Sequence, residues 1–206
     1  MIATIVSLLV AIALAVGAGP LCWYVLQWSA LKVTWPPPDA AATTAGAGLG
    51  LLFLLWRKPN WFLHTAVHEL CHFLVCLLVF VRPTGISITD GKGGAVEHVQ
   101  TDPVRSTIIS IAPYTLPLLL LPVLAIRHFV ITSPDPWRHV MSGLCALLFV
   151  THLQGLFHNV RINITGDQSD LVKVGRPLSA VLITLILMLV TAWTLRALWT
   201  GEPSGH

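Results

Sequence analysis

Histidine and glutamate side chains with the spacing of a metal site lie in one apolar stretch of the chain. His68-Glu69-Leu70-Cys71-His72 forms the pattern H-E-x-x-H. Residues four apart share one face of a helix, so His68 and His72 can both point at one metal ion. Glu69 lies beside them and can take a proton from a water molecule bound to that metal. The pattern therefore indicates a hydrolytic metal centre with Glu69 as its base.

The surroundings of this motif strengthen the interpretation. It lies in an apolar run over about residues 60–81, and Glu69 is the only acidic residue inside any of the long apolar segments. An ionisable side chain at membrane depth is costly, and its default interpretation is functional. The alternative is a helix whose histidines lie at the membrane interface or make a polar contact with another helix. The membrane setting favours the metal centre.

A catalytic zinc ion usually has three protein ligands and one open position, so a third ligand must come from elsewhere. Asp167 and Asp170, just before the last apolar run, are the candidates. A carboxylate at a helix N-terminus is well placed electrostatically. Either residue alone is equally well explained as a helix cap, but for the pair we favour ligation by one of them. His64 could be a ligand, a hydrogen-bond donor to Glu69 or a polar residue near the membrane edge, and the last two interpretations are favoured.

The composition places the chain in the membrane class. Of its 206 residues, 55% are hydrophobic and only 10% are charged, whereas soluble domains carry roughly 25% charged residues. We therefore expect an all-α polytopic membrane protein that lies in the lipid bilayer. The net charge of +3 is small and scattered, which gives no sign of a nucleic-acid partner. The four cysteines all lie in apolar segments, so we expect packing residues rather than a disulfide framework.

The apolar runs predict about six transmembrane helices, with a short β-hairpin between the third and the fourth. Alternating patterns at 86–90 and 95–99, separated by a glycine-rich turn, predict the hairpin. Pro113 and Pro117 are expected to interrupt the fourth helix. Gly46 and Gly50 have the G-x-x-x-G spacing that permits close helix contact. The expected helices cover about residues 2–31, 41–56, 60–81, 104–126, 140–157 and 177–199.

We expect residues 1–58 to form two N-terminal helices, 59–200 the core with the metal motif, and 201–206 a short tail. The first run has no Lys or Arg before it and is too long for a cleaved signal, so we expect it to be retained. If the segments alternate sides, seven basic residues lie on the hairpin face and five on the other, which favours a cytoplasmic hairpin face. The seven are Lys32, Arg82, Lys92, Arg105, Arg161, Lys173 and Arg176, and the five are Arg57, Lys58, Arg127, Arg138 and Arg196.

Several motifs together resemble a known family. The metal motif is followed by the glycine-rich hairpin, by Ala112-Pro113-Tyr114, and by Ser169-Asp170 before a helix that starts with proline. This order is similar to that of the site-2-protease-like intramembrane zinc metallopeptidases, in particular their small bacterial membrane-only branch. The resemblance covers about residues 60–189. The first two apolar runs do not take part in it.

The resemblance implies a role for each matching residue. His68 and His72 would be ligands of one zinc ion per chain, and Glu69 would be the general base. Asp170 matches the late S-D position and is the first choice for the third ligand, with Asp167 in reserve. The chain lacks the L-D-G motif that the better-known branches carry in the last core helix.

The resemblance also implies a function. The protein would hydrolyse peptide bonds of membrane-embedded protein substrates, as a multi-pass protein of a bacterial cell membrane. A helical substrate would have to unwind locally, and the hairpin edge could then bind it by strand addition or be a plain connector. With no soluble recruiting module recognised, substrate selection would come from the helices, the hairpin or a separate regulatory membrane protein.

Two other interpretations remain. The histidines could bind haem or a transported metal ion in a non-proteolytic membrane protein, with His152 as the partner of His68 or His72 across the bundle. Glu69 argues against haem, because a pair of axial ligands does not need an adjacent acid. The chain could also be an inactive relative of the peptidases that serves as a binding scaffold.

Overall fold

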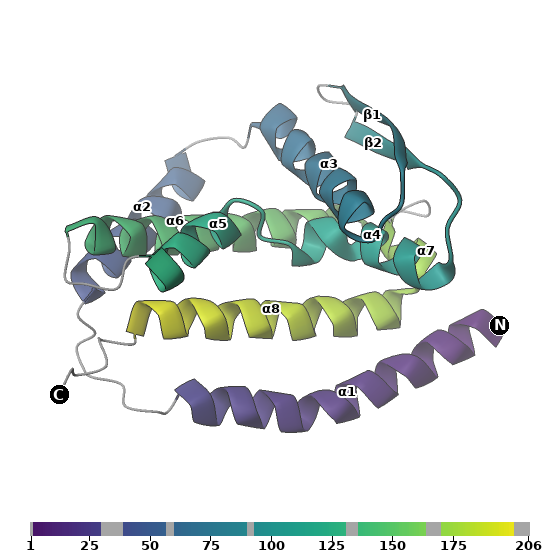
Figure 1. Ribbon diagram of the computed structural model, residues 1–206, viewed down its shortest axis with the longest axis horizontal. Helices are drawn as coiled ribbons and strands as arrows, with labels where there is room; N and C mark the ends of the chain where they lie inside the picture. The colour runs from purple at the N-terminus through teal and green to yellow at the C-terminus, as the bar shows by residue number, and fades with distance from the viewer. Residues whose placement is uncertain are drawn as a thin grey trace.

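The computed structural model describes residues 2–29, 39–56, 60–89, 93–130, 136–163 and 170–199. These residues form helices and one two-stranded antiparallel sheet (Figure 1). In chain order the elements are α1 (Ile2–Ser29), α2 (Ala40–Trp56), α3 (Trp61–Leu78), β1 (Pro83–Thr89), β2 (Gly93–His98), α4 (Pro103–Thr115), α5 (Leu120–Ala125), the π-helix η1 (Ile126–Val130), α6 (Pro136–Asn163), α7 (Asp170–Val174) and α8 (Arg176–Trp199).

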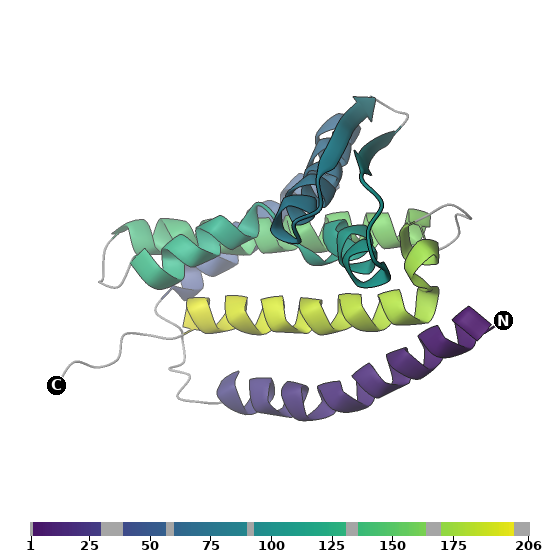
Figure 2. The same ribbon diagram turned by 45° about the vertical axis from the view of Figure 1, so that its right-hand side comes forward.

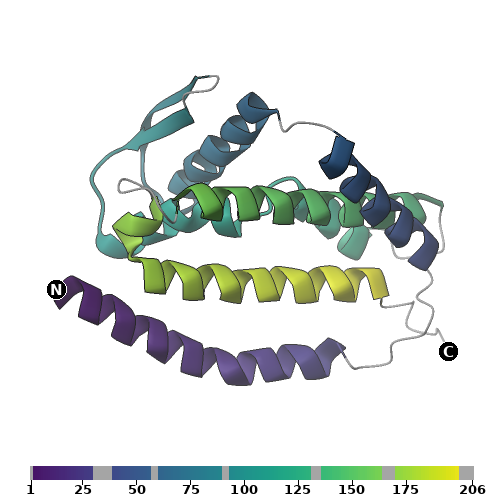
Figure 3. The same ribbon diagram turned by 180° about the vertical axis from the view of Figure 1, so that it is seen from behind.

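The long helices α1, α6 and α8 run along the long axis of the molecule, with α8 between α1 and the layer of α6 (Figure 1). Helix α2 packs against α6, and α1 packs against α8, as the view from behind also shows (Figure 3). Helix α3 lies at an angle to these helices, and the hairpin lies alongside α3 (Figure 2). Helix α3 contacts α4 and both strands, and α4 contacts α7.

The predicted hairpin is confirmed. Strand β1 pairs with β2 so that Ile86 faces Val96 and Ile88 faces Gly94. The pairing begins at Pro83, three residues earlier than the alternating pattern predicted. The predicted turn lies partly outside the described residues, as does the predicted tail over 201–206.

The helical class is confirmed, whereas the count of six transmembrane helices stays a prediction. Among the described residues, two helices are long and apolar enough to cross a membrane, over Pro136–Arg161 and Arg176–Leu198. Shorter apolar stretches cover Leu8–Pro20, Ala40–Leu55 and Phe62–Leu78.

The fourth predicted helix is not continuous. Helix α4 ends at Thr115, and the chain is helical again only from Leu120. Leu116 is extended, with φ −95° and ψ 102°, because the ring of Pro117 disfavours a helical conformation in the residue before it. Pro113, by contrast, lies inside α4. The expected break is therefore found at the second proline only.

Two further differences concern the segment after this break. Helix α6 covers Pro136–Asn163 and is longer than the predicted 140–157 at both ends. Helix α7 was not predicted, because five residues show no clear periodicity. It precedes α8, whose bounds agree with the sixth predicted helix.

Candidate metal centre

Helix α3 presents the two histidines of the motif on one face. Asn60 caps its start, because the Asn60 side chain accepts a hydrogen bond of 3.1 Å from the backbone N–H of Leu63. The ring centroids of His68 and His72 lie 5.0 Å apart. The Nδ1–H of His72 donates a hydrogen bond of 2.7 Å to the backbone carbonyl of Ile109 in α4. This bond leaves Nε2 of His72 as the nitrogen with a free lone pair, as a metal ligand requires.

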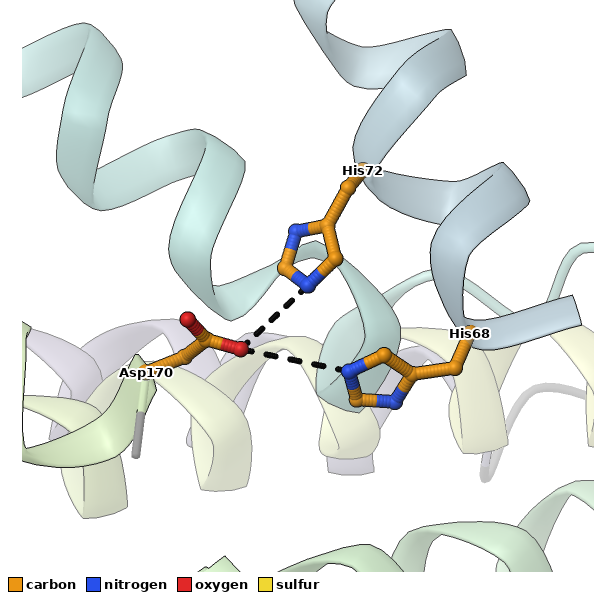
Figure 4. A group of neighbouring side chains, drawn as sticks. All are labelled: His68, His72 and Asp170. Atoms are coloured by element: carbon orange, nitrogen blue, oxygen red, sulfur yellow. Dashed lines mark ion pairs between the residues drawn. The ribbon is translucent and has the colours of Figure 1, made fainter. Parts of the chain in front are cut away.

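Helix α7 brings Asp170 to these histidines (Figure 4). Its Oδ2 lies 3.3 Å from Nε2 of His72 and 3.9 Å from Nε2 of His68, and the three ligand atoms lie within 4.8 Å of one another. With bonds of about 2.0–2.2 Å, two ligand atoms on a tetrahedral zinc ion lie about 3.3–3.6 Å apart. Two nitrogens and one carboxylate oxygen are also a ligand set of catalytic zinc. The separation between His72 and Asp170 lies in this range, whereas that between His68 and Asp170 is wider. The residue types therefore fit a zinc ion, and His68 would have to move closer to Asp170 to share it.

The carboxylate of Asp170 is shared between two kinds of partner. Its Oδ1 accepts a hydrogen bond of 3.0 Å from the Nζ of Lys173. Burial raises the pKa of Asp170, but contacts with His68 and His72 outweigh it and hold the pKa below its usual range. This pairing of Lys173 with Asp170 was not predicted, although a spacing of three residues is a signal for an ion pair on a helix.

Of the remaining predicted site residues, Asp167 lies outside the described residues. Glu69 is buried, with 5% of its surface exposed, and it lies against the hairpin. A β-carbon placed on Gly94 of β2 would come within 2.5 Å of Glu69 Cγ and 2.9 Å of Cδ. His64 faces α6, where its Nε2–H donates a hydrogen bond of 2.7 Å to Oδ1 of Asn159. The His64 ring also packs edge-on against His158.

Tyr114 of α4 contacts both α3, which carries the histidines, and α7, which carries Asp170. Its fully buried ring packs edge-on against His68, with 5.7 Å between centroids, and it shares a core cluster with Leu171 of α7 and Ile183 of α8. Its hydroxyl is buried and has no hydrogen-bond partner among the described residues. Tyr114 belongs to the Ala112-Pro113-Tyr114 stretch that resembles the family, but no contact with the site was predicted for it.

An apolar groove of about 600 Å³ involves the two helices that carry His72 and its partner Ile109. It is lined by α3, α4 and α8, with Val75, Ile111 and Leu182 among the lining residues. Val75 follows His72 by three residues on α3, and Ile111 lies two residues after Ile109, whose carbonyl binds His72. The groove and the metal-binding face therefore share two helices.

The model of the family described as Peptidase M50B-like matches residues 30–160, more than half of the chain. The chain belongs to the Peptidase M50B-like family. This family lies within the site-2-protease group, so the resemblance read from the motifs is confirmed at that level. No curated protein and no solved structure matches the chain.

The Peptidase M50B-like family is a family of membrane metallopeptidases. The match contains His68, Glu69 and His72 and ends before Asp170. It also includes the second apolar run, which the motif resemblance had left out. The predicted division of the chain at residues 58–59 stays a prediction.

Proposed function

We propose that this Peptidase M50B-like protein is an intramembrane zinc endopeptidase that hydrolyses peptide bonds of membrane-embedded proteins. One observation carries the proposal. His68 and His72 of α3 meet Asp170 of α7, with ligand atoms within 4.8 Å of one another, next to a buried glutamate. Family membership supports the reaction class, and the apolar helices support the membrane setting.

Each side chain of this site would have a distinct role in hydrolysis. His68, His72 and Asp170 would hold one zinc ion and leave its fourth position open. Bound zinc polarises the scissile carbonyl and lowers the pKa of water towards ~7. Glu69 accepts a proton from the attacking water molecule and returns it to the leaving amine. Lys173 binds the Asp170 oxygen that does not face the histidines and so fixes the orientation of the carboxylate.

The substrate we propose is an apolar segment that unwinds at the site, because the carbonyls of an intact helix are already hydrogen-bonded. Strand β2 lies against Glu69 through Gly94, so its free edge would bind an extended segment by strand addition. The apolar groove beside α3 and α4 suits the apolar side chains that flank the cleaved bond.

The proposal includes a place in the cell and a source of selectivity. The protein would be a multi-pass protein of a bacterial cell membrane, with the hairpin face in the cytoplasm. Its site would lie below that face, since α3 continues for only six residues beyond His72, or roughly 9 Å along the helix, before it ends at Leu78. A separate regulatory membrane protein would assist the bundle and the hairpin in substrate choice.

The test uses the full chain purified in detergent and reconstituted with single-span membrane proteins as probes. We expect about one zinc ion per chain and cleavage within the apolar segment of a probe. Glu69→Gln should keep the zinc and lower the cleavage rate by at least about 100-fold, because general base catalysis contributes about that much.

Two outcomes would overturn the proposal. Cleavage by the Glu69→Gln variant at the rate of the unchanged protein would remove Glu69 from the mechanism. Purified protein without zinc but with absorbance in the haem Soret band would support the haem alternative instead.

A further inference from the structure

The stretch Ala112-Pro113-Tyr114 contains a proline in a place where helices seldom tolerate one. Pro113 lies inside α4, where it lacks the N–H that would bind the carbonyl four residues earlier. That carbonyl belongs to Ile109. It is the same carbonyl that accepts the hydrogen bond of 2.7 Å from Nδ1–H of His72.

We propose that Pro113 is a positioning residue for His72. Because the proline offers no N–H, the Ile109 carbonyl is free of its helical partner and binds the histidine instead. This bond places the proton on Nδ1 and aims Nε2 at the site that Asp170 also faces. A residue with an N–H at position 113 would compete with His72 for the same oxygen. The expected change in zinc affinity rests on the proposed function. The expected tautomer of His72 does not.

The variant Pro113→Ala tests this role through two readouts of opposite sign. Alanine restores a helical hydrogen bond and is the residue that helices favour most, so the melting temperature of the zinc-free protein should stay equal or rise. Zinc affinity, measured by competition with a chromogenic chelator, should fall about 10-fold, as when the partner of a ligating histidine is lost. Pro122→Ala, in α5, is the matched control and should bind zinc as the unchanged chain does.

A second measurement does not need zinc. Nitrogen NMR of ¹⁵N-labelled histidine in the zinc-free protein should show His72 with its proton on Nδ1, and Pro113→Ala should reduce the share of that tautomer. Equal zinc affinity in Pro113→Ala and the unchanged chain would overturn the inference, as would an unchanged chain whose His72 carries its proton on Nε2. Failure of the unchanged chain to bind zinc would overturn the proposed function, while the tautomer measurement would still decide this inference.

A different observation concerns the other side of the site. Gly94 of β2 packs so closely on Glu69 that an added β-carbon would lie 2.5 Å from Cγ, a distance that real β-carbons do not show. The same β-carbon would lie 2.8 Å from the carbonyl oxygen of Ser87 in β1. Glu69 is 5% exposed, so the hairpin backbone forms part of its enclosure.

We infer that Gly94 is a positioning residue for the proposed general base. The strand backbone holds the Glu69 side chain in place, and only glycine lets the two approach. Any side chain at position 94 would push the carboxylate away from the attacking water, and a shift of about 1 Å in a reacting group can cost about 100-fold in rate. This inference rests on the proposed function.

The variant Gly94→Ala should keep its zinc and lower kcat by about 10- to 100-fold, with a smaller change in KM. Gly85→Ala is the matched control in the same hairpin, because a β-carbon there would come no closer than 3.5 Å to Glu97. It should cleave as the unchanged chain does. Equal kcat in Gly94→Ala and the unchanged chain would overturn the inference, whereas no cleavage by the unchanged chain would overturn the proposed function.

A double-mutant cycle in zinc-free protein separates Glu69 from Ser87. Gly94→Ala should lower the melting temperature more when Glu69 is present than in a Glu69→Ala background, by about 3 °C or more. An equal loss in both backgrounds would show that Ser87 alone excludes a side chain and would overturn the role of Gly94 toward Glu69.

Discussion

The two oxygens of Asp170 have different partners. Oδ2 faces His72 at 3.3 Å and His68 at 3.9 Å, while Oδ1 accepts a hydrogen bond from Lys173. The Lys173 side chain is largely exposed, and an exposed ion pair contributes little to folding. We therefore attribute to Lys173 an effect on the orientation of the carboxylate rather than on stability.

Replacing the third ligand should act on zinc and not on the fold. Asp170→Asn keeps the shape of the side chain but removes its charge, so we expect zinc affinity to fall by about 100-fold or more, beyond what loss of an outer hydrogen bond costs. Chelator competition measures the affinity. Asp167→Asn is the matched control, and loss of zinc from that variant instead would make Asp167 the ligand.

At the scale of elements, glycines set the contact between α2 and α6. A β-carbon on Gly46 would collide with the backbone carbonyl of Gly143, and one on Gly50 would lie 3.0 Å from the side chain of Val150. The G-x-x-x-G spacing predicted this close contact, and the structure identifies α6 as the partner helix. Backbones that approach so closely gain packing that larger residues would prevent.

Gly46→Ala should therefore destabilise the protein. Overpacking costs about 1–3 kcal/mol, and here the obstacle is a backbone that cannot rotate away, so we expect a fall of several degrees in Tm. Gly48→Ala in the same helix is the control, since a β-carbon there meets nothing within 4 Å. That variant should gain up to about 1 kcal/mol from helix propensity. Equal Tm values for the two variants would contradict the prediction.

Local patterns predicted the elements whose signals lie within a few residues. The H-E-x-x-H spacing placed His68 and His72 on one face of α3, and alternation located the hairpin. Contacts between distant segments left little such signal: the G-x-x-x-G spacing indicated a close helix contact but did not identify α6 as the partner. The meeting of α7 with α3 followed from family resemblance and from the need for a third ligand. The approach of Gly94 to Glu69 depends on how the sheet tilts over α3, which no spacing encodes.

At the scale of the whole molecule, the start of α2, η1 and the start of α6 meet at the end opposite to α7 (Figure 1), and an ion cluster links them. Oδ2 of the buried Asp39 accepts hydrogen bonds from Arg127 at 2.6 Å, from Arg138 at 3.2 Å and from Ser142 at 3.0 Å. These residues join the start of α2 to η1 and to the first turns of α6. Two arginines share one carboxylate, so the cluster depends strongly on that one side chain.

Asp39→Asn should destabilise the protein without changing the site. Two buried guanidinium groups would lose their counter-charge, which costs about 3–5 kcal/mol, or roughly 10 °C in Tm for a chain of this size. Zinc affinity should not change. Asp102→Asn is the control, because Asp102 is an exposed cap of α4 and asparagine caps a helix equally well.

Acid should act on the same cluster. Burial raises the pKa of Asp39, but hydrogen bonds from Arg127, Ser142 and Arg138 outweigh it and lower the pKa below its usual value. The stabilisation is thus complete above the unfolded pKa of about 3.9 and is lost as the pH falls through the lower folded pKa. Below about pH 4, the unchanged chain should lose more stability than Asp39→Asn, and parallel curves of Tm against pH would contradict this.

Helix α7 has five residues, too few for a helix to persist alone in solution. Its position depends on Leu171, which lies in a core with Tyr114 and Ile183 and whose carbonyl accepts a hydrogen bond from Ser179. A metal ion bound by Asp170 and the histidines of α3 would bind only while α7 is docked, so mass action would strengthen the docking as free metal rises. The concentration of free metal would then set the fraction of molecules in which α7 is docked on α3, before any peptide binds.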